Sequence, residues 1–136
     1  MTGGSISGRQ TATNYSDLIE RHTVAYRIEP DWIRALIIVE ARRPPSEIGN
    51  RVPPTNIDAV KWSDLENLSR EQFMDVSTNI RLCALLLRRI LDRLPEGSKS
   101  LGYLATLYDD LGAQSVSNYG LKVERAYAER WWEEKR

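Results

Sequence analysis

The amino-acid sequence predicts an all-α protein. In several separate segments, apolar side chains recur at the three- and four-residue spacing of one helix face. Prolines stand where these helices begin or must end. No segment shows the alternation of apolar and polar residues that is typical of a half-buried strand, and no internal repeat is visible. Together these observations favour a helical domain with a single core.

Length and charge narrow the class of protein. The 136 residues, 41% of them hydrophobic, suffice for one core and are too few for two ordinary domains. Nineteen basic residues balance nineteen acidic ones, so we expect no nucleic acid partner and no membrane attraction driven by net charge. No stretch approaches the roughly 20 apolar residues of a membrane span. The N-terminal residues also lack the charged start and apolar run of a signal peptide.

The N-terminal third of the chain predicts a leader and two helices. Residues 1–13, rich in Gly, Ser and Thr, predict a flexible leader or linker, with the domain spanning residues 14–136. A first helix follows, with Asn14 or Ser16 as its N-cap. Pro30 suits the first turn of a second helix, DWIRALIIVEARR, which the next proline pair, Pro44 and Pro45, must end.

Residues 44–68 predict a long loop with at most short helical turns, because they contain four prolines and a glycine. A loop of this length is uncommon inside a small helical domain and, when it is ordered, is often functional. We therefore expect this loop to take part in a binding or catalytic site.

The C-terminal half predicts three more helices. The longest, from about 76 to 94, carries a broad apolar face and is the expected central core helix; the apolar Cys83 fits this face as a small hydrophobe. A fourth helix is expected over about 98–111 and a fifth from about Gly120. The fifth helix ends in the tract RAYAERWWEEKR, and we expect Trp131 and Trp132 in this tract to pack against the first helix.

Glu40 is a carboxylate on an apolar helix face. At helical spacing it shares that face with Trp32, Ile33, Leu36 and Ile37, near the C-terminal end of the helix. Burial and the negative end of the helix dipole both favour the protonated carboxyl, which can donate a proton. The alternative is a helix-end residue paired with one of three arginines: Arg43, Arg42 or Arg27.

The loop after Glu40 favours the first interpretation. Asn56, Asp58 and Trp62 lie in the loop and can form a cleft opposite the glutamate. A carboxyl at the mouth of such a cleft is suited to general acid catalysis.

Four segments together resemble a known family. YRIEPDWIRALIIVEARR resembles the first motif of the lytic transglycosylase domain of the lysozyme superfamily, in which a helix after a short proline-containing turn carries the catalytic glutamate. DVSTNIRLCALLLRRILDRL, LATLYDDLGAQSVSNYG and KVERAYAERWW are similar to later segments of that domain, in the same order. The resemblance covers roughly residues 15–132. It implies a compact, divergent lysozyme-like helical domain around a central buried helix.

The resemblance also implies an activity. A peptidoglycan lytic transglycosylase or muramidase cleaves the β-1,4 bond between N-acetylmuramic acid and N-acetylglucosamine. Glu40 would be its single general acid and base, with no cofactor. In the family the 6-hydroxyl of muramic acid often attacks and leaves a 1,6-anhydro product. A hydrolytic variant needs a second carboxylate, for which Asp58 and Asp109 are candidates; the alternative for both is a turn or cap residue.

Substrate-binding residues follow from the matched segments and the loop. The resemblance implies that Tyr108 and Tyr119 line the cleft; the alternative is a core position with the hydroxyl satisfied at the surface. Trp62 can stack on a sugar ring or fill the core, and Asn56 and Asp58 complete the expected substrate site. Asn79 matches a family asparagine whose role we expect to be structural.

Several positions depart from the family pattern. Ala41 stands where the family usually has a serine, Asp109 replaces an asparagine, and IDAVKW occupies the region of the usual G-L-M-Q motif. These departures keep open a catalytically weakened lysozyme-like module that binds cell-wall glycan or a partner protein. A helical interaction domain without any role in sugar binding is a third possibility.

Partners, metals and location complete the expectations. One histidine, His22, and one cysteine, far apart in the sequence, offer no metal site. The expected partners are peptidoglycan strands and an inhibitor or immunity protein. The resemblance is greatest to members attached to secretion or phage-tail-like machinery. It implies delivery by such a machine, or as part of a larger protein, to the periplasm or cell wall.

Overall fold

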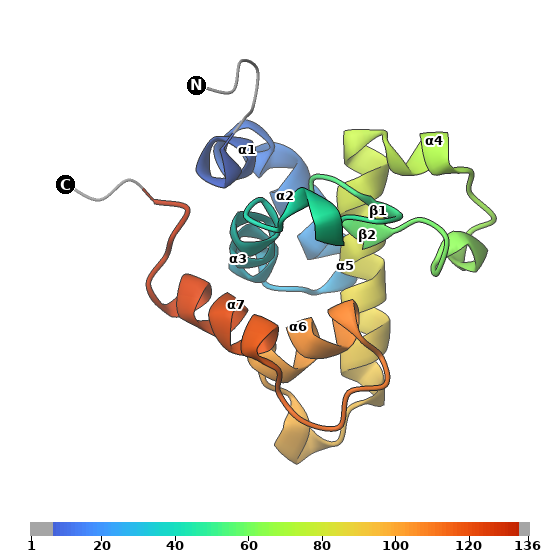
Figure 1. The fold of residues 1–136 in the computed structure, drawn as a ribbon. Coiled ribbons are helices and arrows are strands. Elements are labelled where there is room, and N and C mark those ends of the chain that lie inside the picture. Colours follow the sequence, from blue (N-terminus) through green and yellow to red (C-terminus); the bar gives the residue numbers. More distant parts are fainter. Residues whose placement is uncertain (1–6, 134–136) are drawn as a thin grey trace.

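A computed structural model describes residues 7–133 and shows a mostly helical fold (Figure 1). The α-helices are α1 (Gly8–Asn14), α2 (Ser16–Tyr26), α3 (Pro30–Glu40), α4 (Arg70–Phe73), α5 (Val76–Arg93), α6 (Leu101–Asp109) and α7 (Asn118–Ala128). Short 3₁₀ helices cover Pro45–Glu47, Ser63–Leu65 and Glu96–Ser98. The two strands are β1 (Arg51–Val52) and β2 (Ile57–Asp58). The expectation of a helical protein is confirmed, and α2, α3, α5, α6 and α7 lie where the sequence predicts helices.

Helix α1 lies in the segment for which the sequence predicts a flexible leader, and that prediction is wrong for the residues of this helix. Ser7 caps it, since its hydroxyl accepts the backbone N–H of Gln10, and Ala12 is buried. Gly8 lies so close to α3 that a β-carbon there would stand 2.9 Å from the β-carbon of Ala41. Small side chains suggested a segment unable to pack, yet small side chains are what close approach of two helices requires. Residues 7–13 therefore belong to the folded domain, and residues 1–6 lie outside the described part.

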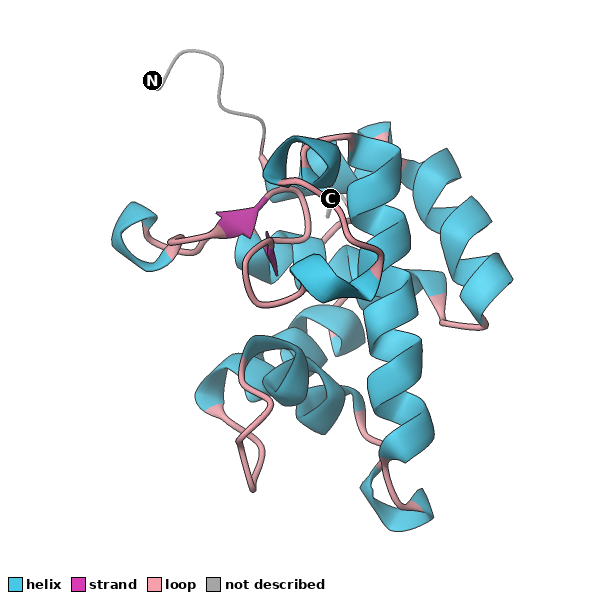
Figure 2. Cartoon of the chain, turned by 90° about the vertical axis from the view of Figure 1, so that its right-hand side faces the viewer, coloured by secondary structure: helices cyan, strands magenta, loops and turns pink. Residues whose placement is uncertain are grey.

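The long loop contains a small hairpin that the sequence analysis did not predict. β1 and β2 pair in antiparallel fashion, with Arg51 opposite Asp58 and Val52 opposite Ile57. Strands of two residues are too short to show an alternating pattern, so no periodicity could have revealed them. Figure 2 shows these strands among the loops and short helical turns of the segment. Val52 and Ile57 are buried, which fixes the hairpin to the domain.

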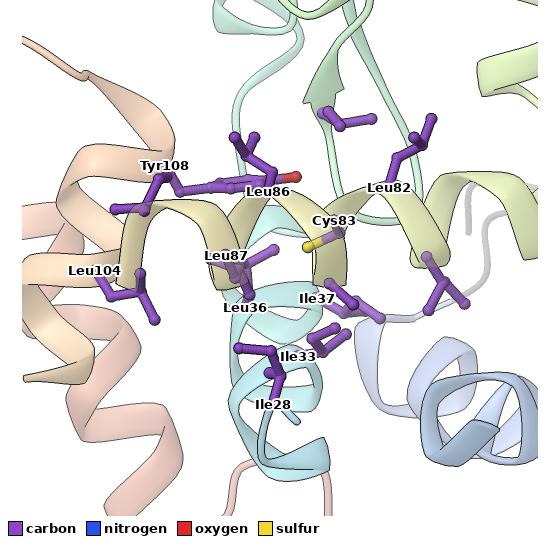
Figure 3. Packing of buried hydrophobic residues seen from close by; sticks show 14 of the residues in the cluster. Ile28, Ile33, Leu36, Ile37, Leu82, Cys83, Leu86, Leu87, Leu104 and Tyr108 are labelled. Atoms are coloured by element: carbon purple, nitrogen blue, oxygen red, sulfur yellow. The ribbon is translucent and has the colours of Figure 1, made fainter. Parts of the chain in front are cut away.

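The core consists of two apolar clusters that share α3. Ile33, Leu36 and Ile37 of α3 pack in the larger cluster with residues of α5 and α6 (Figure 3). The opposite face of α3, with Ile38 and Val39, packs in the second cluster with α1 and α7. The prediction that α5 has a broad buried face is confirmed. However, no residue of α3 is exposed, so the core has a second enclosed helix.

The second cluster also holds the C-terminal segment. Trp132 is buried in it together with Ala12 of α1, so it packs against the N-terminal helix that the sequence analysis had taken for leader. Trp131 is half-buried at the edge of this cluster, and the guanidinium of Arg42 lies 4.7 Å from the centroid of its ring.

Helices α6 and α7 approach each other closely at two glycines. A β-carbon on Gly120 would lie 2.2 Å from the carbonyl oxygen of Gly102. The first turn of α7 can therefore rest directly on α6. This contact fixes where Tyr119, the residue before Gly120, is placed. Across residues 7–133 no helix has the length and apolar character needed to cross a membrane.

Candidate functional site

Glu40 is the last residue of α3, and only 3% of it is exposed. Its carboxylate accepts four hydrogen bonds from side chains. Nε of Arg43 lies 2.6 Å from Oε1, and Nη2 of Arg43 lies 3.1 Å from Oε2. Nδ2 of Asn56 lies 3.1 Å from Oε1, and the hydroxyl of Tyr119 lies 2.5 Å from Oε2. Both carboxylate oxygens are thus held by donors.

Arg43 forms a two-point ion pair with Glu40. The planar guanidinium matches the two oxygens of a carboxylate, and such paired bonds are among the stronger hydrogen bonds in proteins. The bonds to Glu40 raise the pKa of Arg43 above its ordinary value, although burial acts in the opposite direction. Of the arginines named as alternative partners, Arg43 is the one that pairs with Glu40; Arg42 lies on Trp131.

The ion pair modifies the expectation for Glu40. The expectation rested on burial and on the helix end alone. The structure adds donors from Arg43, Asn56 and Tyr119, which together hold both carboxylate oxygens. Glu40 is therefore an anchored side chain, and Arg43 bridges its two oxygens.

Asn56 comes from the turn of the hairpin. Its backbone is left-handed, with φ of 52°, a conformation that asparagine tolerates better than most residues. Its side-chain amide donates to the backbone carbonyl of Glu40 as well as to the carboxylate. The same carbonyl also accepts the backbone N–H of Arg43. Asn56 therefore ties the hairpin turn to the end of α3 and positions the carboxyl at the same time.

The hairpin turn is held by buried polar side chains. Asn79 of α5 accepts the N–H and hydroxyl of Thr55 and donates to the carbonyls of Val52 and Phe73. The hydroxyl of Tyr108 donates to the carbonyl of Thr55. The structural role expected for Asn79 is present. Tyr108 is 5% exposed and lines only a recess of about 10 Å³ beside Glu40, so it braces the turn instead of lining the larger cleft.

Tyr119 reaches Glu40 from the first turn of α7, which Ser117 caps. Burial raises the pKa of Tyr119 well above its ordinary value, and the negative charge of Glu40 acts in the same direction. The phenol therefore stays protonated and donates to the carboxylate. The guanidinium of Arg43 lies 5.3 Å from the centroid of the Tyr119 ring.

Asp109, the last residue of α6, lies on the far side of Arg43. Its Oδ1 is 3.0 Å from Nη2 of Arg43 and 3.1 Å from Nη2 of Arg51. Charges therefore alternate along the row Glu40, Arg43, Asp109 and Arg51. Side-chain exposure rises along this row from 2% through 10% to 25% for the last two. In the structure Asp109 is an ion-pair partner.

A cleft of about 560 Å³ opens beside Glu40 and Arg43. Small-molecule sites in proteins commonly have volumes of this order. The other lining residues are mainly apolar and include Ile37, Ile48 and Pro54. Helix α1 supplies Thr11 and the adjoining residue Tyr15. Thr11 falls within residues 1–13, for which the sequence predicts a leader, so this part of the lining was not predicted.

Trp62 does not lie in this cleft. It lines a separate pocket of about 240 Å³, together with Leu65, Leu86 and Leu107, and packs against the larger core cluster. The alternative interpretation, a tryptophan that fills the core, agrees with this position. Stacking of Trp62 on a sugar ring stays a prediction, at a pocket separate from the cleft beside Glu40.

Asp58 is a turn residue. Its Oδ1 accepts the backbone N–H groups of Val60 and Lys61. It also lines the small recess that Glu40 and Asn56 share. Within residues 7–133 there is no group of three or more His, Cys, Asp or Glu side chains placed to hold a metal ion.

The structure thus brings Glu40, Asn56 and Tyr119 together, places Asp58 and Tyr108 beside them, and separates Trp62 from them. Arg43, one of the three arginines that the sequence offers as partners of Glu40, follows it at helical spacing and is the one that binds it. Arg51 carried no such signal. No protein-family model, curated protein or solved structure matches this chain.

Proposed function

We propose that the protein cleaves the glycan strands of peptidoglycan, with Glu40 as general acid and base. The observation that carries the proposal is the position of Glu40: a nearly buried carboxyl whose two oxygens are held by Asn56 and Tyr119 at the side of a cleft of about 560 Å³. The lysozyme-like domain and the lytic transglycosylase activity come from the resemblance of the four sequence segments. They are part of the same proposal.

The chemistry needs one carboxyl that changes its protonation state twice. Protonated Glu40 gives its proton to the glycosidic oxygen, and the bond from C1 to that oxygen breaks. The 6-hydroxyl of the muramic acid then forms a bond to C1 and returns its proton to Glu40. The product carries a 1,6-anhydro ring, and the catalyst is restored without water or a cofactor.

The neighbours of Glu40 suit this role. Tyr119 and Asn56 can hold the carboxyl in one orientation in both protonation states, because each donates through a group that keeps its proton. The apolar part of the cleft, with Ile37 and Ile48, suits the acetyl methyl group and the apolar face of a sugar ring. No second carboxylate is required, which agrees with the turn role of Asp58 and the ion-pair role of Asp109.

A second candidate is a module that binds cell-wall glycan or a partner protein without cleavage. The observation that favours it is the two-point bond from Arg43 to Glu40, since an ionised carboxylate has no proton to donate. In either case the site of action would be the periplasm or cell wall, with delivery by a secretion or phage-tail-like machine or within a larger protein. An inhibitor or immunity protein would be a further partner.

The test is incubation of purified peptidoglycan with the protein, followed by mass spectrometry. We expect 1,6-anhydro ends, which have the mass of the hydrolysis product less one water. Glu40→Gln should reduce cleavage by ~10²-fold or more, because general acid catalysis supplies about that factor. Glu71→Gln, on the exposed surface of α4, is the matched control and should cleave like the parent.

The other outcomes of the digestion distinguish the alternative functions. Reducing ends would assign a hydrolytic muramidase and reopen the search for a second carboxylate. Intact strands that sediment with the protein would select the binding module. Undiminished cleavage by a well-folded Glu40→Gln variant would remove Glu40 from the mechanism.

A further inference from the structure

Arg43 poses a problem for general acid catalysis by Glu40. The acid must hold a proton when the glycosidic oxygen arrives, yet Arg43 binds both oxygens of the carboxylate. Arg43 also lines the cleft, so a bound glycan would meet it directly. If Glu40 acts as an acid, Arg43 has to move first.

The structure contains an acceptor for Arg43 after such a move. Its Nη2 is 3.1 Å from Oε2 of Glu40 and 3.0 Å from Oδ1 of Asp109, so it already bonds to both carboxylates. Nη1 lies 3.9 Å from Oε1 of Glu47. Arg43 follows the end of α3, so its backbone is not part of a helix.

Asp109 is itself fixed from the other side. Arg51 of β1 donates to the same Oδ1 that Arg43 contacts, at 3.1 Å. An unpaired cation would be costly in a site where the Arg43 side chain is only 10% exposed. Moving the guanidinium fully onto Asp109 would keep it paired. Glu40 would keep its bonds to Asn56 and Tyr119.

We propose that Arg43 exchanges between Glu40 and Asp109, and that Asp109 is a positioning residue that receives the guanidinium when a glycan enters the cleft. This inference rests on the proposed function, since glycan is the ligand that drives the exchange. Without glycan, Arg43 holds Glu40 as a carboxylate. With glycan in place, Arg43 pairs with Asp109, and Glu40 can take up the proton that it later donates.

Protonation of Glu40 depends on all the groups around it. The titratable and charged groups of the neighbouring elements are Tyr15 next to α1, Arg43 and Glu47 after α3, Arg51, Asp58 and Lys61 of the hairpin region, Cys83 of α5, Tyr108 and Asp109 of α6, and Tyr119 of α7. Of these, Arg43 is the cation in direct contact with the carboxylate.

The test is Asp109→Asn, studied by cleavage of peptidoglycan across pH and by calorimetric binding of a soluble β-1,4-linked N-acetylglucosamine tetramer. Without the second carboxylate Arg43 should stay on Glu40. We expect about tenfold weaker binding and about tenfold slower cleavage at neutral pH, the effect of one lost charge-assisted hydrogen bond. The cleavage deficit should shrink as the pH falls, because acid protonates Glu40 and releases Arg43.

Two further variants separate positioning from structure. Asp109→Glu keeps a carboxylate and should restore binding and cleavage. Arg43→Gln removes the cation, so the alkaline limb of the pH–rate profile should move to higher pH. Asp92→Asn is the matched control: it removes a carboxylate paired with Arg88 on α5 that lines neither the cleft nor the recess beside Glu40, and it should behave like the parent.

The exchange is overturned if Asp109→Asn binds the tetramer and cleaves like the parent at every pH, or if its loss is uniform across pH and Asp109→Glu does not restore it. A parent protein that binds the tetramer without cleaving peptidoglycan would contradict the proposed reaction. The ratio of the tetramer dissociation constants of Asp109→Asn and the parent would then test the exchange by itself. A parent that neither binds nor cleaves would overturn both proposals.

Discussion

Cys83 is a reactive side chain that is buried in the core. The thiol lies inside the larger apolar cluster, near Tyr108 (Figure 3). Burial raises the pKa of Cys83 to about 12, although hydrogen bonds with Tyr108 and Thr55 act in the opposite direction. The thiolate is the nucleophile, so a thiol that stays protonated and buried reacts slowly.

We therefore expect a disulfide reagent such as dithionitrobenzoate to label Cys83 only as fast as the protein unfolds. Absorbance after mixing should rise slowly for the native protein and at once in concentrated urea, where one thiol per chain should react. Rapid labelling of the native protein would show that the core opens at Cys83.

The positions of some site residues follow from the local sequence pattern, and the positions of others do not. Glu40 was predictable because helical spacing and the proline pair fix both its face and its place at a helix end. Tyr119 and Asn56 could be nominated, one by resemblance and one by its place in the loop, but their contacts with Glu40 depend on how α7 and the hairpin dock. The pocket that Trp62 lines does not follow from the sequence, because a side chain in a loop can turn to either side.

At the scale of elements, α1 was missed for a reason that can be tested. Replacing glycine by alanine within a helix normally stabilises it by up to about 1 kcal/mol. In Gly8→Ala the new methyl would lie 2.9 Å from Ala41 Cβ and 3.1 Å from Ile38 Cα. The helices α1 and α3 would have to separate, so we expect the free energy of unfolding to fall by about 1–3 kcal/mol.

Gly97→Ala is the matched control for this prediction. No heavy atom lies within 4 Å of a β-carbon at Gly97, so the free energy of unfolding should change by about 0.5 kcal/mol or less. Urea unfolding followed by circular dichroism measures both variants. A Gly8→Ala variant as stable as the parent would mean that α1 does not pack as described.

The elements that sequence reasoning found and those it missed differ in length and composition. Helices α3 and α5, of 11 and 18 residues, present enough turns for a periodic apolar face to be seen. The two-residue strands and the seven-residue α1 do not. Their structure comes from tertiary contacts, such as the bonds of Asn79 to the hairpin turn, which leave no periodic trace in the sequence.

At the scale of the whole molecule, stability should depend on the one histidine. Burial, followed by the charges of Arg21 and Arg81, lowers the pKa of His22 below its ordinary value, and its Nε2 lies 2.8 Å from the hydroxyl of Ser77. The unfolded chain therefore takes up a proton at a higher pH than the folded protein does. The stability that neutral His22 contributes is present above about pH 6.5 and is lost as the pH falls through the depressed value.

We expect the free energy of unfolding to decrease more steeply between about pH 7 and about pH 5 for the parent than for His22→Gln, which can keep the bond to Ser77 but does not titrate. Urea unfolding at several pH values measures the two slopes. The carboxylates Glu66, Asp75 and Asp92, whose pKa values are lowered by their hydrogen bonds, contribute at lower pH. Identical slopes would show that His22 is accessible to protons in the folded state.

The groups around Glu40 come from distant parts of the chain, and this affects how the site forms. Asn56, Asp109 and Tyr119 lie 16, 69 and 79 positions after Glu40 in the sequence. Helices need only local contacts and form quickly, whereas closing long segments costs chain entropy that is recovered late. A chain with α7 not yet docked would have most of its helical content but no bond from Tyr119 to Glu40. Far-UV circular dichroism could not distinguish that chain from the finished protein, so the environment of Tyr119 is the better measure of complete folding.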